Sequence, residues 1–399
     1  MAKEATSHAK IERWTAGRKS DLVLGVTKGQ NMKMKICYVG SAGSIHTKRW
    51  VKYFADKGHE VHWISLDPSI FNNIKNVTYY EIRQLPLKVL NIFPYIFKMK
   101  KLIKTINQEI LHIHYAGTYG LVGSLSGFHP MIITAWGSDI LIAGKSRIKR
   151  PLVKFVLKKA DLITCDADHM KKAIIRMGIH EKKIRIIYFG TDTTQFNPGP
   201  KNEVLRKQLA AQDGPVIISL RSLEPIYDVE SFIRAVPLVL SHIPNATFIV
   251  GGQGSQMSLL TELAKSLGVS KSVRFTGIIP NHLLPDYLNV SDVYASTSLS
   301  DAGLAASTAE AMACALPVVV TDSGENRLWV KEGEGGFLVP LKDPVALSEK
   351  ILYLLENPNK SRRYGSFNRR IIQERNNYHI EMGKMEKLYQ EVVKRHGEA

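Results

Sequence analysis

The segment VYASTSLSDAGLAASTAEAMACAL, residues 293–316, has the residue types and spacing of a nucleotide-binding site. Backbone N–H groups at the start of a helix bind phosphate, and small residues there let the phosphate approach. We expect Gly303, Leu304 and Ala305 to present such groups at the helix start. Glu310 would then lie two turns along the same helical face, roughly 10 Å away at ~1.5 Å per residue. One helix face could therefore bind a diphosphate and a ribose, the alternative being an ordinary surface glutamate.

The elements that must position this segment alternate between short apolar runs and helical stretches. The apolar runs of the first half are KICYVG, HEVHWISL, ILHIHY, MIITAW, LITCD and KIRIIYF, and those of the second half are VIISLR, ATFIVGG, VRFTG, DVYAST, LPVVVT and GFLVP. Strands that alternate with helices predict parallel α/β sheets, whose ligands bind where the strands end. The Pro and Gly residues of NPGPKNE, near Asn197, predict a linker. We therefore predict two Rossmann-like domains.

The composition limits the possible partners. The 399 residues include 54 Lys and Arg against 36 Asp and Glu, a formal charge of +18, which attracts anions or only keeps the protein in solution. No zinc-finger spacing, basic zipper or RNP-type aromatic signature occurs, so we expect no nucleic acid. No apolar run is long enough to cross a bilayer. The candidate anionic partners are therefore a membrane surface and a phosphate-bearing substrate.

The N-terminus and the cysteines indicate a reducing compartment. The first 32 residues lack the apolar centre of a secretory signal, and we expect them to form a disordered extension. The three cysteines, Cys37, Cys165 and Cys314, stand far apart in apolar segments, which predicts neither a disulfide framework nor a zinc site. We therefore expect a cytoplasmic protein, peripheral on the inner face of the cell membrane if it binds that surface.

The motif EAMACALPVV, preceded by SLSDAG, resembles the E-x7-E donor segment of the retaining glycosyltransferases of family four, which have the GT-B fold. Further segments resemble this family's motifs in the same order, from about Lys35 to the C-terminus: GSAGSIHTKRWVKYFADKGHEVH, AWGSD, YFGTDTTQFNPG, VRFTGIIP and SDVYAST. Each segment alone is a weak signal, but the ordered set is specific.

The resemblance implies roles for individual residues. Glu310 would bind the donor ribose, and the backbone of residues 303–305 would lie near the hexose and the diphosphate. Arg221, in SLRSLEP, would neutralise the diphosphate, since its planar guanidinium forms paired hydrogen bonds with phosphate. The alternative for Arg221 is an ion pair with Glu224 at the strand end.

Further positions follow from the same resemblance. Gly43 would allow the backbone to approach the donor, and Ile278 in VRFTGIIP would lie near its base. Asp139 and His46 would line the cleft near the acceptor. For His46, a histidine that simply faces solvent at a helix start is the alternative.

The chain departs from the family pattern at three places. The first acid of E-x7-E should stand at Ala302, whereas the nearest acid is Asp301. The lysine that usually follows the arginine would fall at Ile226 or Tyr227. Trp136 replaces the usual histidine of the AWGSD loop. These changes affect donor choice and rate more than fold.

The family mechanism implies front-face displacement, in which catalysis is mainly positioning and stabilisation of the leaving diphosphate. No Asp-x-Asp metal motif follows a strand, so we expect neither a metal nor a cofactor. The substrates would be a UDP or GDP sugar and a lipid-linked or cell-envelope glycan acceptor. The alternatives are a nucleotide-sugar epimerase of the same fold and a non-catalytic nucleotide-sugar-binding protein. A weaker alternative is a dinucleotide oxidoreductase in which Asp67 binds the ribose, although GSAGS lacks the G-x-G-x-x-G spacing.

The predicted order of domains places the acceptor side first. Residues 33–198 would form the acceptor-side domain, 199–370 the nucleotide-sugar-binding domain, and 371–399 a helix that packs back on the first domain. The final helix has an apolar face that must dock, made of Met382, Met385, Leu388, Tyr389, Val392 and Val393.

Two basic stretches of the first domain could lie on an anionic bilayer. One places Ile92, Phe93, Ile96 and Phe97 beside four lysines, and the other covers residues 145–159. The alternative is two helices that cover the sheet and extend their lysines into solvent.

Overall fold

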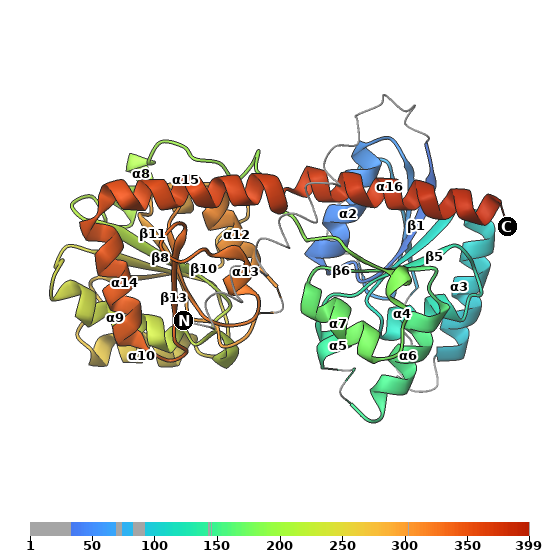
Figure 1. Cartoon of the computed structure of the whole chain (residues 1–399), viewed down its shortest axis with the longest axis horizontal. Coiled ribbons are helices and arrows are strands. Elements are labelled where there is room, and N and C mark those ends of the chain that lie inside the picture. The colour runs from blue at the N-terminus through green and yellow to red at the C-terminus, as the bar shows by residue number, and fades with distance from the viewer. Residues whose placement is uncertain are drawn as a thin grey trace, which may run out of the picture. The chain divides into compact units, whose positions relative to one another are not determined.

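The computed structural model describes residues 33–68, 74–82, 92–142, 144, 146–301 and 303–398. The predicted extension over residues 1–32 lies outside the described residues. The described chain forms two separate parallel sheets, each covered by helices, as the alternation of apolar runs predicts (Figure 1). Parallel sheets are buried on both faces, and accordingly the inner strands of both sheets consist of buried residues.

The first sheet has seven strands in the order β3-β2-β1-β4-β5-β6-β7, and every neighbouring pair is parallel. Its strands are β1 Lys35–Val39, β2 Glu60–Ser65, β3 Val77–Glu81, β4 Ile110–His114, β5 Met131–Thr134, β6 Leu162–Cys165 and β7 Ile184–Ile186. The order changes direction at β1, between β2 and β4. The loop that follows β1 therefore lies at a topological switch point, where doubly wound sheets bind ligands.

The second sheet has six strands in the order β10-β9-β8-β11-β12-β13, again all parallel. Its strands are β8 Val216–Leu220, β9 Thr247–Gly251, β10 Val273–Gly277, β11 Val293–Ser296, β12 Val318–Thr321 and β13 Gly336–Val339. The switch point falls between β8 and β11. Residue 221 and the loop from residue 297 consequently leave the same edge of the sheet as neighbours.

Helices connect the strands and cover the sheet faces (Figure 1). They are α2 Ile45–Asp56, α3 Ile92–Ile106, α4 Thr118–Ser124, α5 Ser138–Leu141, α6 Lys149–Lys159, α7 Asp168–Arg176, α8 Glu203–Gln208, α9 Val229–Leu240, α10 Met257–Ser266, α11 Leu284–Asn289, α12 Ala306–Ala313, α13 Asn326–Trp329, α14 Pro344–Glu356, α15 Pro358–Arg375 and α16 Tyr378–Gly397. No described helix is both long and apolar enough to cross a membrane. The three cysteines are buried and free, as their spacing predicted.

The last helix, α16, docks through the apolar face that the sequence indicated. Five of its six predicted residues are buried, and Val393 is half-buried. At the centre, the hydroxyl of Tyr389 lies 2.8 Å from the hydroxyl of Tyr38 on β1 and 2.5 Å from Nδ1 of His112 on β4. These contacts attach α16 to the first sheet.

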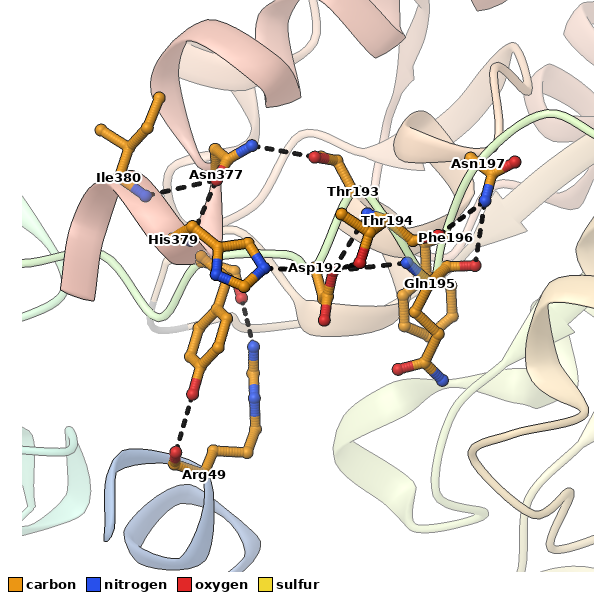
Figure 2. A network of polar contacts seen from close by, with 12 residues as sticks. Arg49, Asp192, Thr193, Thr194, Gln195, Phe196, Asn197, Asn377, His379 and Ile380 are labelled. Atoms are coloured by element: carbon orange, nitrogen blue, oxygen red, sulfur yellow. Dashed lines mark hydrogen bonds and ion pairs between the residues drawn. The ribbon is translucent and has the colours of Figure 1, made fainter. Parts of the chain in front are cut away.

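Two chain segments meet where α16 begins. The N–H of Thr191 donates to the carbonyl of Asn376, and the N–H of Tyr378 donates to the carbonyl of Thr191, at 2.7 and 2.9 Å. Figure 2 shows the side chains around this crossing, where Asn377 donates to the Thr193 hydroxyl and the Tyr378 hydroxyl donates to the carbonyl of Arg49. The crossing therefore fixes the position of Arg49 on α2.

Candidate functional site

Arg221 and Asp301 form a buried ion pair at the switch point of the second sheet. Nη2 of Arg221 lies 2.5 Å from Oδ1 of Asp301, and both side chains are less than one tenth exposed. The guanidinium also lies over the ring of Tyr227, 4.3 Å from its centre. The expected alternative partner, Glu224, instead accepts hydrogen bonds from Ser255. Arg221 is thus held by the acid that is displaced from the family position.

The loop that carries Asp301 is fastened by hydroxyl groups. The carbonyl of Ser298 accepts hydrogen bonds from Thr321, at 2.5 Å, and from Ser323, at 3.0 Å. Gly324 has φ +56°, and a Cβ there would lie 2.2 Å from the carbonyl oxygen of Asp301, so only glycine fits. These contacts fix Asp301 against Arg221.

Helix α12 begins later than the sequence suggested. It starts at Ala306 with Ala305 as its N-cap residue, so Gly303 and Leu304 precede the helix instead of forming its first turn. Glu310 accordingly lies little more than one helical turn from the helix start. Ala305 offers no side-chain oxygen to cap this N-terminus, so its first N–H groups have no capping partner there and can bind an anion.

Glu310 carries a carboxyl group that no described residue hydrogen-bonds. Burial raises its pKa to about 7 from the ordinary 4.5, and the positive charge of Arg49 opposes this rise. A carboxylate that has lost water without gaining protein donors is poised to accept hydrogen bonds from a ligand.

Arg49 supplies the positive charge that Glu310 faces, a role that the sequence did not reveal. Its guanidinium donates to the carbonyl of Gly190 at 2.8 Å and lies over the rings of Phe189, at 3.9 Å, and Tyr378, at 4.4 Å. Burial lowers the pKa of Arg49, while Glu310 and Asp192 counteract this change. The sequence feature that could have indicated this role is an arginine in the helix that follows the Gly-rich loop.

His46 and Trp136 pack together at the carboxyl edge of the first sheet. Their rings stack 4.9 Å apart at 21°, and Phe189 meets the His46 ring edge-on at 4.6 Å. Burial, with a smaller effect of Arg49, lowers the pKa of His46 to about 4, so the imidazole is neutral near pH 7. The view that His46 merely faces solvent is therefore wrong, and Trp136 occupies space beside it.

Asp139 does not line the cleft as expected. It is fully buried, and its carboxylate accepts hydrogen bonds from the backbone N–H groups of Ala116, Trp136 and Gly137 at 2.8 to 3.1 Å. Burial raises its pKa, and these backbone hydrogen bonds counteract the rise. Asp139 therefore shapes the loop that carries Trp136 and is a positioning residue.

Two other predicted positions are open. A Cβ on Gly43 would meet only the Ser41 hydroxyl, at 3.6 Å, so the space beside this backbone is free among the described residues. Ile278 follows Gly277 at the end of β10 and is 71% exposed. At both positions the described residues leave space for a ligand.

A cavity of about 960 Å³ lies beside Trp136 and Asp301. It is lined from the first sheet's segments by Trp136, Arg150 and Arg176 among others, and from the second sheet's segments by Asp301 and Glu325. Two of its lining residues contact each other, with Nδ1 of His169 2.9 Å from Oε1 of Glu325. The cavity is large enough for a sugar with part of a second substrate.

Asp166 is a further acid that the sequence analysis missed. It follows β6 directly, and a Cβ added to Gly303 would lie 3.7 Å from its carbonyl oxygen and from Cβ of Ala167. Burial raises the pKa of Asp166 to about 6, and Oδ1 has no hydrogen-bond partner among the described residues. The signal was an acid at the end of the buried strand LITCD.

The two parallel α/β domains, and the groups gathered at the carboxyl ends of their strands, define a two-domain glycosyltransferase of the GT-B type. Residues 35–167 match the model of the glycosyl transferase 4-like family, and residues 201–371 match that of the glycosyl transferases group 1. The chain belongs to the glycosyl transferases of group 1.

Relatives and solved structures extend over most of the chain. The N-acetyl-alpha-D-glucosaminyl L-malate synthase of Bacillus anthracis is 23% identical over 91% of this chain and 98% of its own length. A GDP-mannose-dependent alpha-(1-6)-phosphatidylinositol monomannoside mannosyltransferase of Mycolicibacterium smegmatis is 27% identical over 67% of this chain and 72% of its own. Anabaena HepE, solved with UDP and glucose, matches with a TM-score of 0.76 at 20% identity over 90% of this chain and 99% of its own, which supports the GT-B fold.

Proposed function

We propose that this glycosyltransferase moves a hexose, with retention of configuration, from a UDP or GDP sugar to a hydroxyl of a lipid-linked or cell-envelope glycan acceptor. One observation carries the proposal. Glu310 offers a carboxyl group to which no described residue donates, on the short helix α12, and the loop before this helix carries Asp301, the partner of Arg221. The ribose would contact Glu310, the diphosphate would contact the N-terminus of α12 and Arg221, and the hexose would contact Asp301.

The proposed chemistry uses no metal ion. The α12 N–H groups and Arg221 stabilise the charge that develops on the leaving diphosphate. The acceptor hydroxyl attacks from the face that the diphosphate leaves, and the diphosphate oxygen takes its proton. Neutral His46 and the Trp136 loop border the acceptor, and Ile278 lies beside the base.

The names of the relatives support this choice of substrates. One relative is GDP-mannose-dependent and acts on a phosphatidylinositol mannoside, and HepE was solved with UDP and glucose. The first name contains a GDP sugar and a lipid-linked acceptor, and the second contains a uridine nucleotide and a hexose.

Thermal-shift screening against UDP, GDP and ADP sugars tests the donor site. The best ligand is then measured with Glu310→Ala and Asp301→Ala, and with Glu349→Ala as a control, because Glu349 is an exposed glutamate on α14. We expect both site variants, and not the control, to lose binding or turnover. Unchanged binding and turnover in both site variants would refute the site.

Product analysis distinguishes the reaction classes. Free nucleotide together with an α-linked glycoside formed from an α-linked donor supports retaining transfer. An epimerised donor formed without an acceptor would identify an epimerase instead. Activity that survives EDTA is expected if the transfer needs no metal.

We also propose that the enzyme is cytoplasmic and works at an anionic membrane surface. On α3, Phe97 is 72% exposed among Lys98, Lys100, Lys101 and Lys104, which are all exposed. On α6, Leu152 and Phe155 are exposed near Lys158 and Lys159. Ile96 packs against the core instead of joining this surface, and the side chains of Ile92 and Phe93 lie outside the described residues.

Sedimentation with vesicles tests the membrane proposal. Vesicles that contain phosphatidylserine should bind the protein, and salt should weaken the binding. Replacing Lys98 and Lys101 with Gln should reduce it, whereas replacing Lys265 and Lys271, on the other domain, should not. Equal binding to neutral vesicles, or no binding at all, would contradict the proposal.

A further inference from the structure

Two histidines and an aspartate converge at the amino edge of the first sheet, away from the donor segment. His129 stands two residues before β5, Asp161 one residue before β6, and His396 in the last turn of α16. One potential ligand atom from each lies within 4.8 Å of the other two. Strands β5 and β6 are parallel neighbours, and Trp136 and Asp166 follow their opposite ends. The cluster and the candidate active site therefore lie at opposite edges of one sheet.

Asp161 lies beside His129 and is held by the backbone at the start of β5. Nδ1 of His129 lies 2.7 Å from Oδ2 of Asp161, and the N–H of Met131 donates to the same oxygen at 2.7 Å. The short distance leaves Nδ1 of His129 and this carboxylate side by side, where one ion can replace the hydrogen between them and bind both.

His396 completes the cluster from a distant part of the chain. Its ring is nearly parallel to that of His129, 6.1 Å away at 19°. The ion pairs that Lys394 and Arg395 form with Glu398 and Glu391 stay within the helix. The stacked rings of His396 and His129 therefore place this last turn beside the start of β5.

We propose that His129, Asp161 and His396 form a binding site for a divalent transition metal ion of the Zn²⁺ type, which pins the end of α16 to the first sheet. Two imidazoles and a carboxylate suit Zn²⁺, Co²⁺ or Ni²⁺, whereas Ca²⁺ and Mg²⁺ prefer oxygen ligands alone. Small side-chain movements bring ligand atoms 4.8 Å apart to the distances around one ion, with water completing the coordination. Both His129 and Asp161 are partly exposed, so the ion enters from solvent. This metal is structural, and the transfer reaction does not pass through it.

Metal titration of the full chain, without a histidine tag and after chelator treatment, tests the site. We expect one equivalent of Zn²⁺ by calorimetry, a visible absorption band with Co²⁺, and a higher Tm with Zn²⁺. His396→Phe keeps a ring to stack on His129 but removes the ligand, and should weaken binding at least tenfold. His242→Ala, an exposed histidine of the other domain, should bind as the wild type does.

The outcomes separate a metal site from a packing contact. If the wild type binds no stoichiometric Zn²⁺, or if His396→Phe binds it equally well, the proposal is wrong. The Tm of His396→Phe without metal, compared with that of the wild type, shows whether the variant folds. His129→Gln gives a second test that leaves α16 unchanged, and it too should lose the Zn²⁺-dependent rise in Tm.

Discussion

Nη2 of Arg221 lies 2.5 Å from Oδ1 of Asp301, so an acid neutralises the arginine proposed to meet the donor diphosphate. Asp301→Asn removes this charge and nearly keeps the shape. We expect the variant to bind the free nucleoside diphosphate several-fold more tightly, because Arg221 then offers its whole charge. We expect kcat with the nucleotide sugar to fall at least tenfold, because the hexose no longer contacts a carboxylate at position 301.

Calorimetry with the nucleotide and steady-state kinetics with the sugar donor measure the two effects of Asp301→Asn separately. Asp292→Asn is the control, since Asp292 forms its pair with Lys201 away from this loop. Weaker nucleotide binding together with unchanged kcat would contradict both expectations.

The raised pKa of Glu310 predicts a pH-dependent cost of folding. Between the ordinary value of 4.5 and about 7, the unfolded chain releases a proton that the folded chain retains, so the free energy of unfolding falls as pH rises through this window. Glu310→Gln has no carboxyl group at this position and should not show this fall in the free energy of unfolding. We expect the variant to gain stability over the wild type as pH rises from about 5 to about 8.

Urea unfolding of both proteins at the two pH values checks this prediction. Asp166 also has a raised pKa, but it is present in both proteins and cancels in the comparison. A stability difference that does not change with pH would show that Glu310 is not desolvated as described. The same variant should bind the donor more weakly, since an amide replaces the charged acceptor.

Arg49 should control the titration of Glu310 from the other domain. Its positive charge opposes the rise of the Glu310 pKa, so Arg49→Met should move that pKa further upward. We therefore expect the pH at which donor binding is half lost to shift to a higher value. Lys52→Met on the same helix is the control, because Lys52 is exposed and pairs with Asp56. Superimposable pH profiles of Arg49→Met and the wild type would overturn this coupling.

The hydroxyl of Tyr389 should contribute to stability but not to chemistry. Tyr389→Phe leaves Nδ1 of His112 and the hydroxyl of Tyr38 without this buried partner, which should cost about 1–3 kcal/mol of unfolding free energy. Tyr353→Phe, which removes a surface hydrogen bond with Lys360, should change stability far less. Urea midpoints of the two variants test this, and equal midpoints would contradict it.

The sequence by itself indicated twelve of the thirteen strands in the described chain and their order along it. Twelve apolar runs became twelve strands, because buried parallel strands need nearly continuous apolar residues. Strand β3 was missed since it is an edge strand of half-buried and exposed residues, without a continuous apolar run. The segment around Glu310 was also found from sequence, because one strand, one loop and one helix build it locally.

Only the tertiary structure decided which charges meet. Residues 221 and 301 are neighbours because β8 and β11 flank a switch point. Arg49 on α2 and Glu310 on α12 interact although more than 250 residues separate them in the sequence. Asp139 was expected in the cleft, yet it faces inward, where hydrogen bonds from backbone N–H groups partly offset the cost of its burial. Residue types and spacing determine local structure, whereas burial and pairing depend on contacts between segments that lie far apart in the chain.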